Sequence, residues 1–196
     1  SITVNVTDGI STTTQSVTVN VTNVNEAPVI SSLASTINVD ENDTAVVTVS
    51  ASDPESDSLT YSLSGTDASS FSISSSGVIT FNSAPDYETK TSYSITVNVT
   101  DGTNSVSQSV TVNVTNVNDN NPVITSSSTF TVAENQTDVG TVTATDADGD
   151  GLSYTLSGTD ASSFSIGSSS GVITFNSAPD YETKTSYSIT VSVTDG

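Results

Sequence analysis

The sequence predicts an all-β protein built of tandem seven-stranded antiparallel Greek-key sandwiches. Three observations predict it. Val and Ile alternate with Thr, Ser and Asn, as in Ile95, Val97 and Val99, and a period of two residues is typical of half-buried strands. Short alternating runs are separated by Gly, Pro, Asn and Asp, which favour turns. Finally, residues 64–71 (SGTDASSF) recur as residues 157–164, so the same unit occurs twice.

The repeat has a period of about 93 residues, which suits self-sufficient domains rather than solenoid units. We expect residues 1–27 to be the C-terminal strands of a preceding repeat. Residues 28–120 are expected to form a complete repeat, and residues 121–196 a repeat that lacks its last strand. The chain begins and ends at the same point of the unit. It is therefore expected to be a window of a longer polypeptide.

Each strand of the complete repeat is expected where the alternation is strongest. The predicted strands are residues 31–39, 44–51, 59–64, 71–73, 78–81, 93–100 and 107–115. The side chains expected to face the core are Val47, Val49, Leu59, Tyr61, Leu63, Phe71, Ile73, Val78, Ile79, Phe81, Tyr93, Ile95, Val97, Val110 and Val112. These residues are enough for one modest core per repeat.

Composition excludes several classes of function. The chain has 22 acids, two lysines and a net charge of -20, so it cannot neutralise the phosphates of nucleic acid or anionic lipid. With no His and no Cys it lacks the usual zinc, haem and iron–sulfur ligands, and the familiar acyl-transfer triads have no base. We therefore expect no enzyme, and hard cations remain as the candidate ligands. No apolar run approaches the roughly 20 residues that span a bilayer.

The acids gather at a few loop positions. Of the 22 acids, 17 occupy positions that recur with the repeat: Glu41 and Glu134; Asp53, Glu55 and Asp57; Asp146, Asp148 and Asp150; Asp86, Glu88, Asp180 and Glu182; Asp8, Asp101 and Asp195; and Glu26 and Asp119. So many carboxylates in one region would repel one another unless a cation lay among them. Ca²⁺ takes six to eight oxygen ligands, including backbone carbonyls, and suits such clusters.

At these residues the sequence resembles the cadherin repeat, in the bacterial form found in long arrays of giant surface adhesins. The matching motifs are Glu41-Asn42, Asp86-Tyr87-Glu88, the linker Asn118-Asp119-Asn120 followed by Pro122, Asp146-Ala147-Asp148, and the strand-end residues Asp101 and Asp195. The ordered set is far more specific than any one triplet. The resemblance implies two or three Ca²⁺ ions at each junction between repeats.

For the second junction, the resemblance implies three ligand sets. The outer ion would be held by Glu41, Asp86, Glu88 and Asp119, and the middle ion by Glu41, Glu88, Asp119, Asn116, the Val117 carbonyl and Asp148. The inner ion would be held by Asn118, the Asn120 carbonyl, Asp146, Asp148 and Asp195. Asn116 replaces the usual Asp and removes a charge from the middle site. Asp150 has no counterpart in the usual motif and is expected to replace an Asn.

The other two junctions are incomplete in this sequence. At the first, the resemblance implies ligands from Asn25, the Ala27 carbonyl, Asp53, Glu55, Asp57 and Asp101, while the outer ligands would precede residue 1. At the far end, Glu134, Asp180 and Glu182 would need a linker after Gly196. An end site of this chain is expected to be partial.

The function expected from these patterns is mechanical. Tandem repeats stiffened by Ca²⁺ would hold distal domains of an extracellular adhesin or surface fibre away from the cell. In one alternative the repeats are themselves adhesive, binding like repeats or polysaccharide. In another the chain is a filament subunit that assembles by strand donation, because the last repeat lacks a strand of which residues 16–21 are a spare copy.

Overall fold

The computed structural model describes residues 1–196 and divides into two compact units. The first unit contains Ser1–Ile37, Ala45–Asn82 and Ser94–Thr111, and the second contains Asn38–Thr44, Ser83–Tyr93 and Val112–Gly196. The end of the middle repeat (residues 28–120) that leads into the linker therefore belongs to the same unit as the third repeat (residues 121–196).

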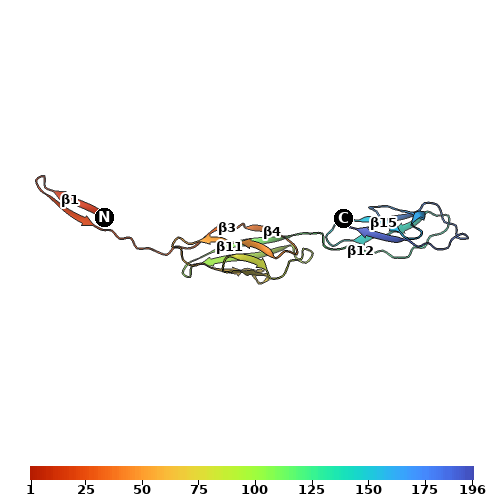
Figure 1. The fold of residues 1–196 in the computed structure, drawn as a ribbon, viewed down its shortest axis with the longest axis horizontal. Coiled ribbons are helices and arrows are strands. Elements are labelled where there is room, and N and C mark those ends of the chain that lie inside the picture. Colours follow the sequence, from red (N-terminus) through yellow and green to blue (C-terminus); the bar gives the residue numbers. More distant parts are fainter. The chain divides into compact units, whose positions relative to one another are not determined.

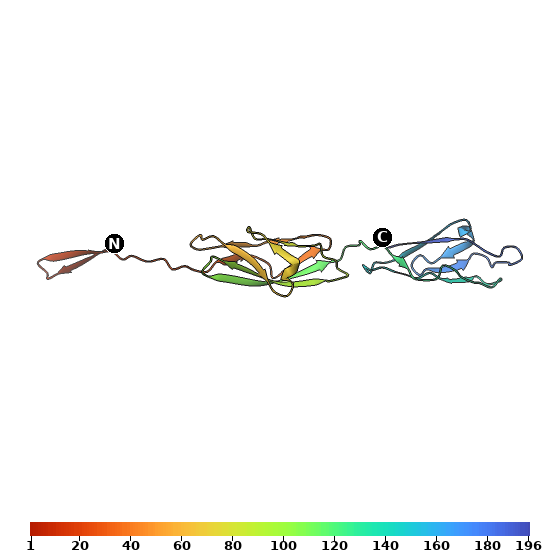
Figure 2. The ribbon, with the colours of Figure 1, turned by 90° about the horizontal axis from the view of Figure 1, so that it is seen from below.

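The middle repeat is a sandwich of two β layers, as Figures 1 and 2 show. One layer is a four-stranded sheet in the order β4 (Thr36–Asp40), β11 (Ser105–Thr115), β10 (Ser92–Thr100) and β7 (Thr60–Ser64). The other contains the pair β3 (Val29–Ser32) and β6 (Ser50–Ser52), and the three-stranded sheet β5 (Ala45–Thr48), β9 (Val78–Phe81) and β8 (Phe71–Ile73). This arrangement confirms the predicted all-β sandwich.

Two of the predicted strands are wrong in extent. Residues 31–39 form two strands, because β3 pairs with β6 whereas β4 pairs with β11 in the other layer. Residues 44–51 likewise form β5 and β6, which are interrupted at Val49. Alternation of apolar residues indicates an extended backbone, but it cannot show where a strand changes its pairing partner.

The core of the middle repeat lies between the layers. Its most buried side chains include Ile79, Ile95, Val97, Val99, Val110 and Val112, each at most 1% exposed. The rings of Phe71 and Phe81, paired across β8 and β9, have their centroids 4.3 Å apart. Val78, which we expected inside, is 40% exposed because its neighbour Ile79 occupies the inward position of β9. Val39 is also buried, although it was absent from the predicted core.

The third repeat has fewer strands than the middle repeat. Its sheets are β12 (Val123–Ile124) with β14 (Ala144–Thr145), β13 (Asp138–Thr141) with β17 (Val172–Phe175) and β16 (Phe164–Ile166), and β15 (Ser153–Ser157) with β18 (Thr190–Thr194). Residues 129–133, equivalent to β4, form no strand. In the middle repeat β4 pairs only with β11, and the residues equivalent to β11 would come after Gly196.

The first 27 residues contain one hairpin. In it β1 (Ile2–Thr7) pairs with β2 (Thr12–Val17) in the register Ile2 to Val17. Asp8 Oδ1 closes the turn by accepting bonds from the N–H groups of Ile10 at 2.9 Å and Ser11 at 2.7 Å. The apolar side chains of β1 remain exposed.

Gly77 provides a test of the core packing. Its φ is +80°, and a Cβ there would lie 2.6 Å from the Val49 carbonyl oxygen. Gly102 has a similar φ of +97°, but a Cβ there would have no heavy atom within 4 Å. We expect Gly77→Ala to destabilise the middle repeat by about 3 kcal/mol and Gly102→Ala by about 1 kcal/mol. Calorimetric unfolding measures both, and equal losses would contradict the close approach.

Candidate metal centre

Four carboxylates meet where the middle repeat leads into the linker. Glu41, Glu88, Asp119 and Asp148, called here the linker cluster, each offer an oxygen, and these oxygens lie within 4.8 Å of one another. They come from the loop after β4, the loop before β10, the linker and the loop after β14. Residues far apart in the sequence therefore converge on one small volume.

Glu41 is the buried member of the linker cluster, with only 4% of its surface exposed. One of its oxygens, Oε2, accepts a hydrogen bond from the Tyr87 N–H at 2.8 Å. The other, Oε1, accepts a bond from the Val117 N–H at 2.7 Å. This carboxylate therefore joins a loop of the middle repeat to the linker.

Asp148 binds the linker from the other side. Its Oδ2 accepts hydrogen bonds from the N–H groups of Asp119 at 3.2 Å and Asn120 at 2.8 Å. The backbone carbonyl of Asp148 accepts a bond from Asn116 Nδ2 at 2.8 Å. Desolvation opposes ionisation of Asp148, but the hydrogen bonds from Asn120 and Asp119 outweigh it and hold the pKa of Asp148 below its usual value.

Glu88 shows the electrostatic cost of the cluster. Desolvation, and then the nearby carboxylates of Glu41, Asp148 and Asp86, raise the pKa of Glu88 above 4.5. The only positive side chains of the protein are Lys90 and Lys184, and neither belongs to the cluster. The ionised form of Glu88 is consequently disfavoured by its neighbours.

The loop after β14 forms a second acidic cluster that shares Asp148 with the first. Oxygens of Asp146, Asp148 and Asp150 lie within 4.8 Å of one another, and Asp146 Oδ1 accepts a bond from the Asp150 N–H at 3.3 Å. The other oxygen, Asp146 Oδ2, is buried and has no hydrogen-bond partner. The equivalent atom in the middle repeat, Asp53 Oδ2, is also buried and unpartnered. A buried carboxylate oxygen without a donor is costly unless a cation satisfies it.

The first junction brings together part of its predicted ligand set. Asn25 Nδ2 donates to Asp101 Oδ2 at 2.9 Å, and the Glu26 N–H donates to Glu55 Oε2 at 3.1 Å. Asp53 Oδ1 accepts bonds from the N–H groups of Glu55 at 2.9 Å and Asp57 at 3.1 Å. A side-chain hydrogen bond with Glu55, followed by its charge, raises the pKa of Glu26. Ala27 is exposed beside this group.

The far end of the third repeat repeats the pattern without a linker. Glu134, Asp180 and Glu182 place oxygens within 4.8 Å of one another, and all three side chains are exposed. Glu134 Oε2 accepts a bond from the Tyr181 N–H at 3.1 Å, as Glu41 does from Tyr87. The exposure of Glu134 shows what the linker adds at Glu41.

Several residues predicted for the second junction lie outside the linker cluster. Asp86 accepts bonds from the Thr89 N–H at 3.1 Å and from the Thr89 hydroxyl at 2.9 Å, which caps a turn. Asn118 is exposed and makes no hydrogen bond, and Asp195 is half-buried with no bonded partner.

Two linker contacts escaped the sequence reasoning. Asn42 Nδ2 donates to Asp119 Oδ2 at 2.5 Å, and the Asn120 side-chain amide contacts Asp119 Oδ1 at 2.8 Å, Asp148 Oδ1 at 3.1 Å and Glu88 Oε2 at 3.3 Å. The recurrence of Glu-Asn at residues 41–42 and 134–135 was the available signal for Asn42. In both copies this Asn has a positive φ, near +65°.

The donors of these clusters fit a hard cation. Every side-chain group offered is a carboxylate or amide oxygen, and some carboxylate oxygens remain unpartnered. Ca²⁺ accepts six to eight such ligands in flexible geometry, and each added positive charge offsets the repulsion that raises the pKa of Glu88. Residues Glu41, Glu88, Asp119 and Asp148 would hold such an ion, with Asp146 and Asp150 beside them.

Comparisons with known proteins agree with this architecture. The cadherin domain family model matches residues 35–115 and 128–196. Mouse protocadherin Fat 4 is 37% identical over 140 residues, which cover 66% of this chain and 3% of that protein. This chain therefore spans only a small part of that relative.

Solved cadherin structures are also similar. Mouse cadherin-23 EC22-24 is 27% identical with a TM-score of 0.73, over 88% of this chain and 61% of that one. Extracellular cadherin domains 3–6 of protocadherin gamma B2 are 27% identical with a TM-score of 0.70, over 94% of this chain and 51% of that one.

These matches also bear on location and class. Cadherin repeats are parts of extracellular adhesion proteins rather than enzymes, so this segment lies outside the cell. None of its helices has the length and apolar character needed to cross a membrane. The matched family model covers both large repeats, and the chain belongs to the cadherin domain family.

Proposed function

We propose that this chain is a calcium-rigidified extender, in which ions bound at each junction stiffen tandem cadherin repeats that hold other domains away from the cell. The observation that carries the proposal is the linker cluster, where oxygens from the middle repeat, the linker and the loop after β14 lie within 4.8 Å of one another. Cadherin domains bind Ca²⁺, and the oxygen-only donor set suits it. We assign the repeats as residues 1–27, 28–120 and 121–196.

The mechanism is electrostatic. Without a cation, the carboxylates of the linker cluster repel one another across a linker held by a few hydrogen bonds. A bound Ca²⁺ would replace that repulsion with attraction to ligands from several segments at once. Bending the linker would then require ligands to leave the ion, so the joint stiffens.

Near-identical neighbouring repeats support a spacer over a specific adhesive surface. Residues 78–96 recur unchanged as residues 172–190, and a spacer gains length from each copy. We further propose two or three ions per junction and a long array of the bacterial surface-adhesin type. Association with like chains is the alternative, whereas no contact in the structure favours polysaccharide.

Glu88→Gln separates a metal site from a structural carboxylate. Because the folded pKa of Glu88 lies above 4.5, ionised Glu88 destabilises the metal-free protein above that raised pKa and has no such effect below pH 4.5. With a chelator at about pH 7.5, the variant should melt at a higher temperature than the wild type, and this gain should vanish near pH 4. In millimolar Ca²⁺ the variant should instead melt at a lower temperature, since a ligand is lost. The same sign in both solutions would contradict the site.

Glu41→Gln tests the connection between the linker and the middle repeat. Gln can accept a hydrogen bond through only one of its terminal atoms, so either the Tyr87 or the Val117 N–H loses its acceptor. In chelator we expect a loss of about 1–2 kcal/mol, measured by calorimetric unfolding. Glu134→Gln is the matched control at the equivalent, exposed position, and should cost less than about 0.5 kcal/mol. Equal losses would count against a special role of Glu41.

Small-angle scattering tests the stiffening itself. Ca²⁺ should extend the maximum dimension and leave the circular dichroism of the strands unchanged, because each repeat has its own apolar core. Asp119→Ala should weaken Ca²⁺ binding at least about tenfold in calorimetry, roughly 1.4 kcal/mol, and abolish the extension. The control is Asp138→Ala, an exposed carboxylate outside every acidic cluster. A dimension that does not respond to Ca²⁺ would refute the extender mechanism.

A further inference from the structure

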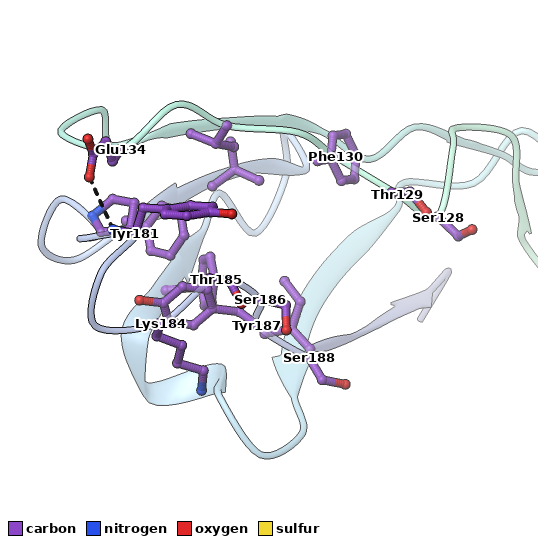
Figure 3. Close-up of a pocket in the computed structure, with 16 residues that line it drawn as sticks. Ser128, Thr129, Phe130, Glu134, Tyr181, Lys184, Thr185, Ser186, Tyr187 and Ser188 are labelled. Atoms are coloured by element: carbon purple, nitrogen blue, oxygen red, sulfur yellow. Dashed lines mark hydrogen bonds between the residues drawn. The ribbon is translucent and has the colours of Figure 1, made fainter.

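The third repeat has an open edge where the middle repeat is closed. In the middle repeat β10 lies between β7 and β11, but its equivalent β18 pairs only with β15. Beside this edge lies a cavity of about 390 Å³ (Figure 3). Its apolar lining includes Phe130, Val132, Phe164, Phe175, Tyr187 and Ile189.

The middle repeat shows what fills this place. There Val110, Val112 and Val114 of β11 are 1%, 0% and 4% exposed. The backbone of β11 and its flanking residues is also bonded on both sides, through Thr111 N–H to Ser35 O at 2.9 Å and Val114 N–H to Thr91 O at 2.9 Å. The Thr115 carbonyl accepts a bond from the Glu41 N–H at 3.0 Å.

The equivalent backbone groups of the third repeat have no such partner. Ser128 O, Thr185 O and Glu134 N–H correspond to Ser35 O, Thr91 O and Glu41 N–H, and they make no hydrogen bond within the chain. An edge of unpaired N–H and C=O groups beside an apolar cavity is a template for an added strand.

The side chains beneath this edge are less buried than their copies. Ile95, Val97 and Val99 are at most 1% exposed, whereas their equivalents Ile189, Val191 and Val193 are only half-buried. The two segments differ at one position, Asn98 against Ser192. The missing cover, rather than the local sequence, therefore accounts for the difference.

The chain carries a second copy of the missing cover. Residues 15–25 (QSVTVNVTNVN) are identical to residues 108–118, which contain most of β11 and the start of the linker. In this copy Val19 is 67% exposed and Val21 is 92% exposed, although their counterparts Val112 and Val114 are buried. The segment contains no charged residue, so it brings no further negative charge to an acidic repeat.

We propose that residues 15–25 of one chain occupy the open edge of the third repeat of a second copy of the same chain. They would lie between β18 and residues 129–133, with Val17, Val19 and Val21 in the cavity. To enter, β2 leaves β1 and pairs with β18, and these partners (ITVNVT and ITVSVT) are nearly identical. The exchange therefore keeps a strand ladder, completes the backbone bonds of a second edge and buries exposed valines.

This contact joins the head of one copy to the tail of the next. Because donor and acceptor are different surfaces, the contact is heterologous, and each bound copy still presents a free donor or a free acceptor. The product is an open chain of subunits. A strand of the same sequence attached covalently after Gly196 would win this groove by its effective concentration, so the test uses the 196-residue chain.

The test is the mass of the 196-residue chain in solution. After prolonged incubation with Ca²⁺ at increasing protein concentration, light scattering on a sizing column should show multiples of 19.9 kDa. Val19→Glu should leave only monomer, because a charge would enter the cavity. It should leave the melting of the repeats unchanged, since Val19 is exposed in the free chain. Thr18→Glu is the control, because its counterpart Thr111 faces solvent, and it should assemble like the wild type.

A synthetic peptide of residues 15–25 gives an independent measurement. It should raise the melting temperature of the third repeat and suppress assembly of the chain, whereas the same peptide with Val19→Glu should do neither. A chain that stays monomeric at every concentration overturns the proposal, whether or not the peptide binds. Assembly of the Val19→Glu variant to the same extent as the wild type also overturns it.

Discussion

The pairing of β11 between β4 and β10 supports both the core and the acidic junction of this protein. Its inward valines cover the sandwich, and Val112 is fully buried. The same backbone then continues into the linker, where the Val117 N–H binds Glu41 and the Asn120 N–H binds Asp148. Closing the core and presenting the carboxylates are thus consequences of one strand, and a change in that strand reaches both.

The repeats act as an internal control for this dependence. Glu41 and Glu134 occupy equivalent positions and both accept an N–H from the loop that follows, yet Glu41 is buried and Glu134 is exposed. Likewise Ile95 is buried whereas Ile189 is half-buried. Side chains with the same local sequence differ because burial belongs to the assembled sandwich and its linker, not to the segment itself.

The junction is held under electrostatic tension that has a chemical use. Neighbouring carboxylates and desolvation raise the pKa of Glu88, while Asp53 Oδ2 and Asp146 Oδ2 are buried without a donor. A core optimised for stability alone would avoid such groups, because each raises the free energy of the metal-free state. A cation would relieve all of them together, which makes the mechanics of the linker sensitive to the ion.

Sequence alone determined the fold class, the period and the candidate ligand types. Alternating Val and Ile report an extended backbone with one buried face, and recurring acids in an otherwise nearly uncharged chain report a shared chemical role. Only the tertiary structure decided that residues 31–39 divide between two layers, and that Asp86 caps a turn while Asn42 and Asn120 contact the linker carboxylates. Strand partners and side-chain contacts depend on segments distant in the chain, and a local pattern carries no information about which of them will meet.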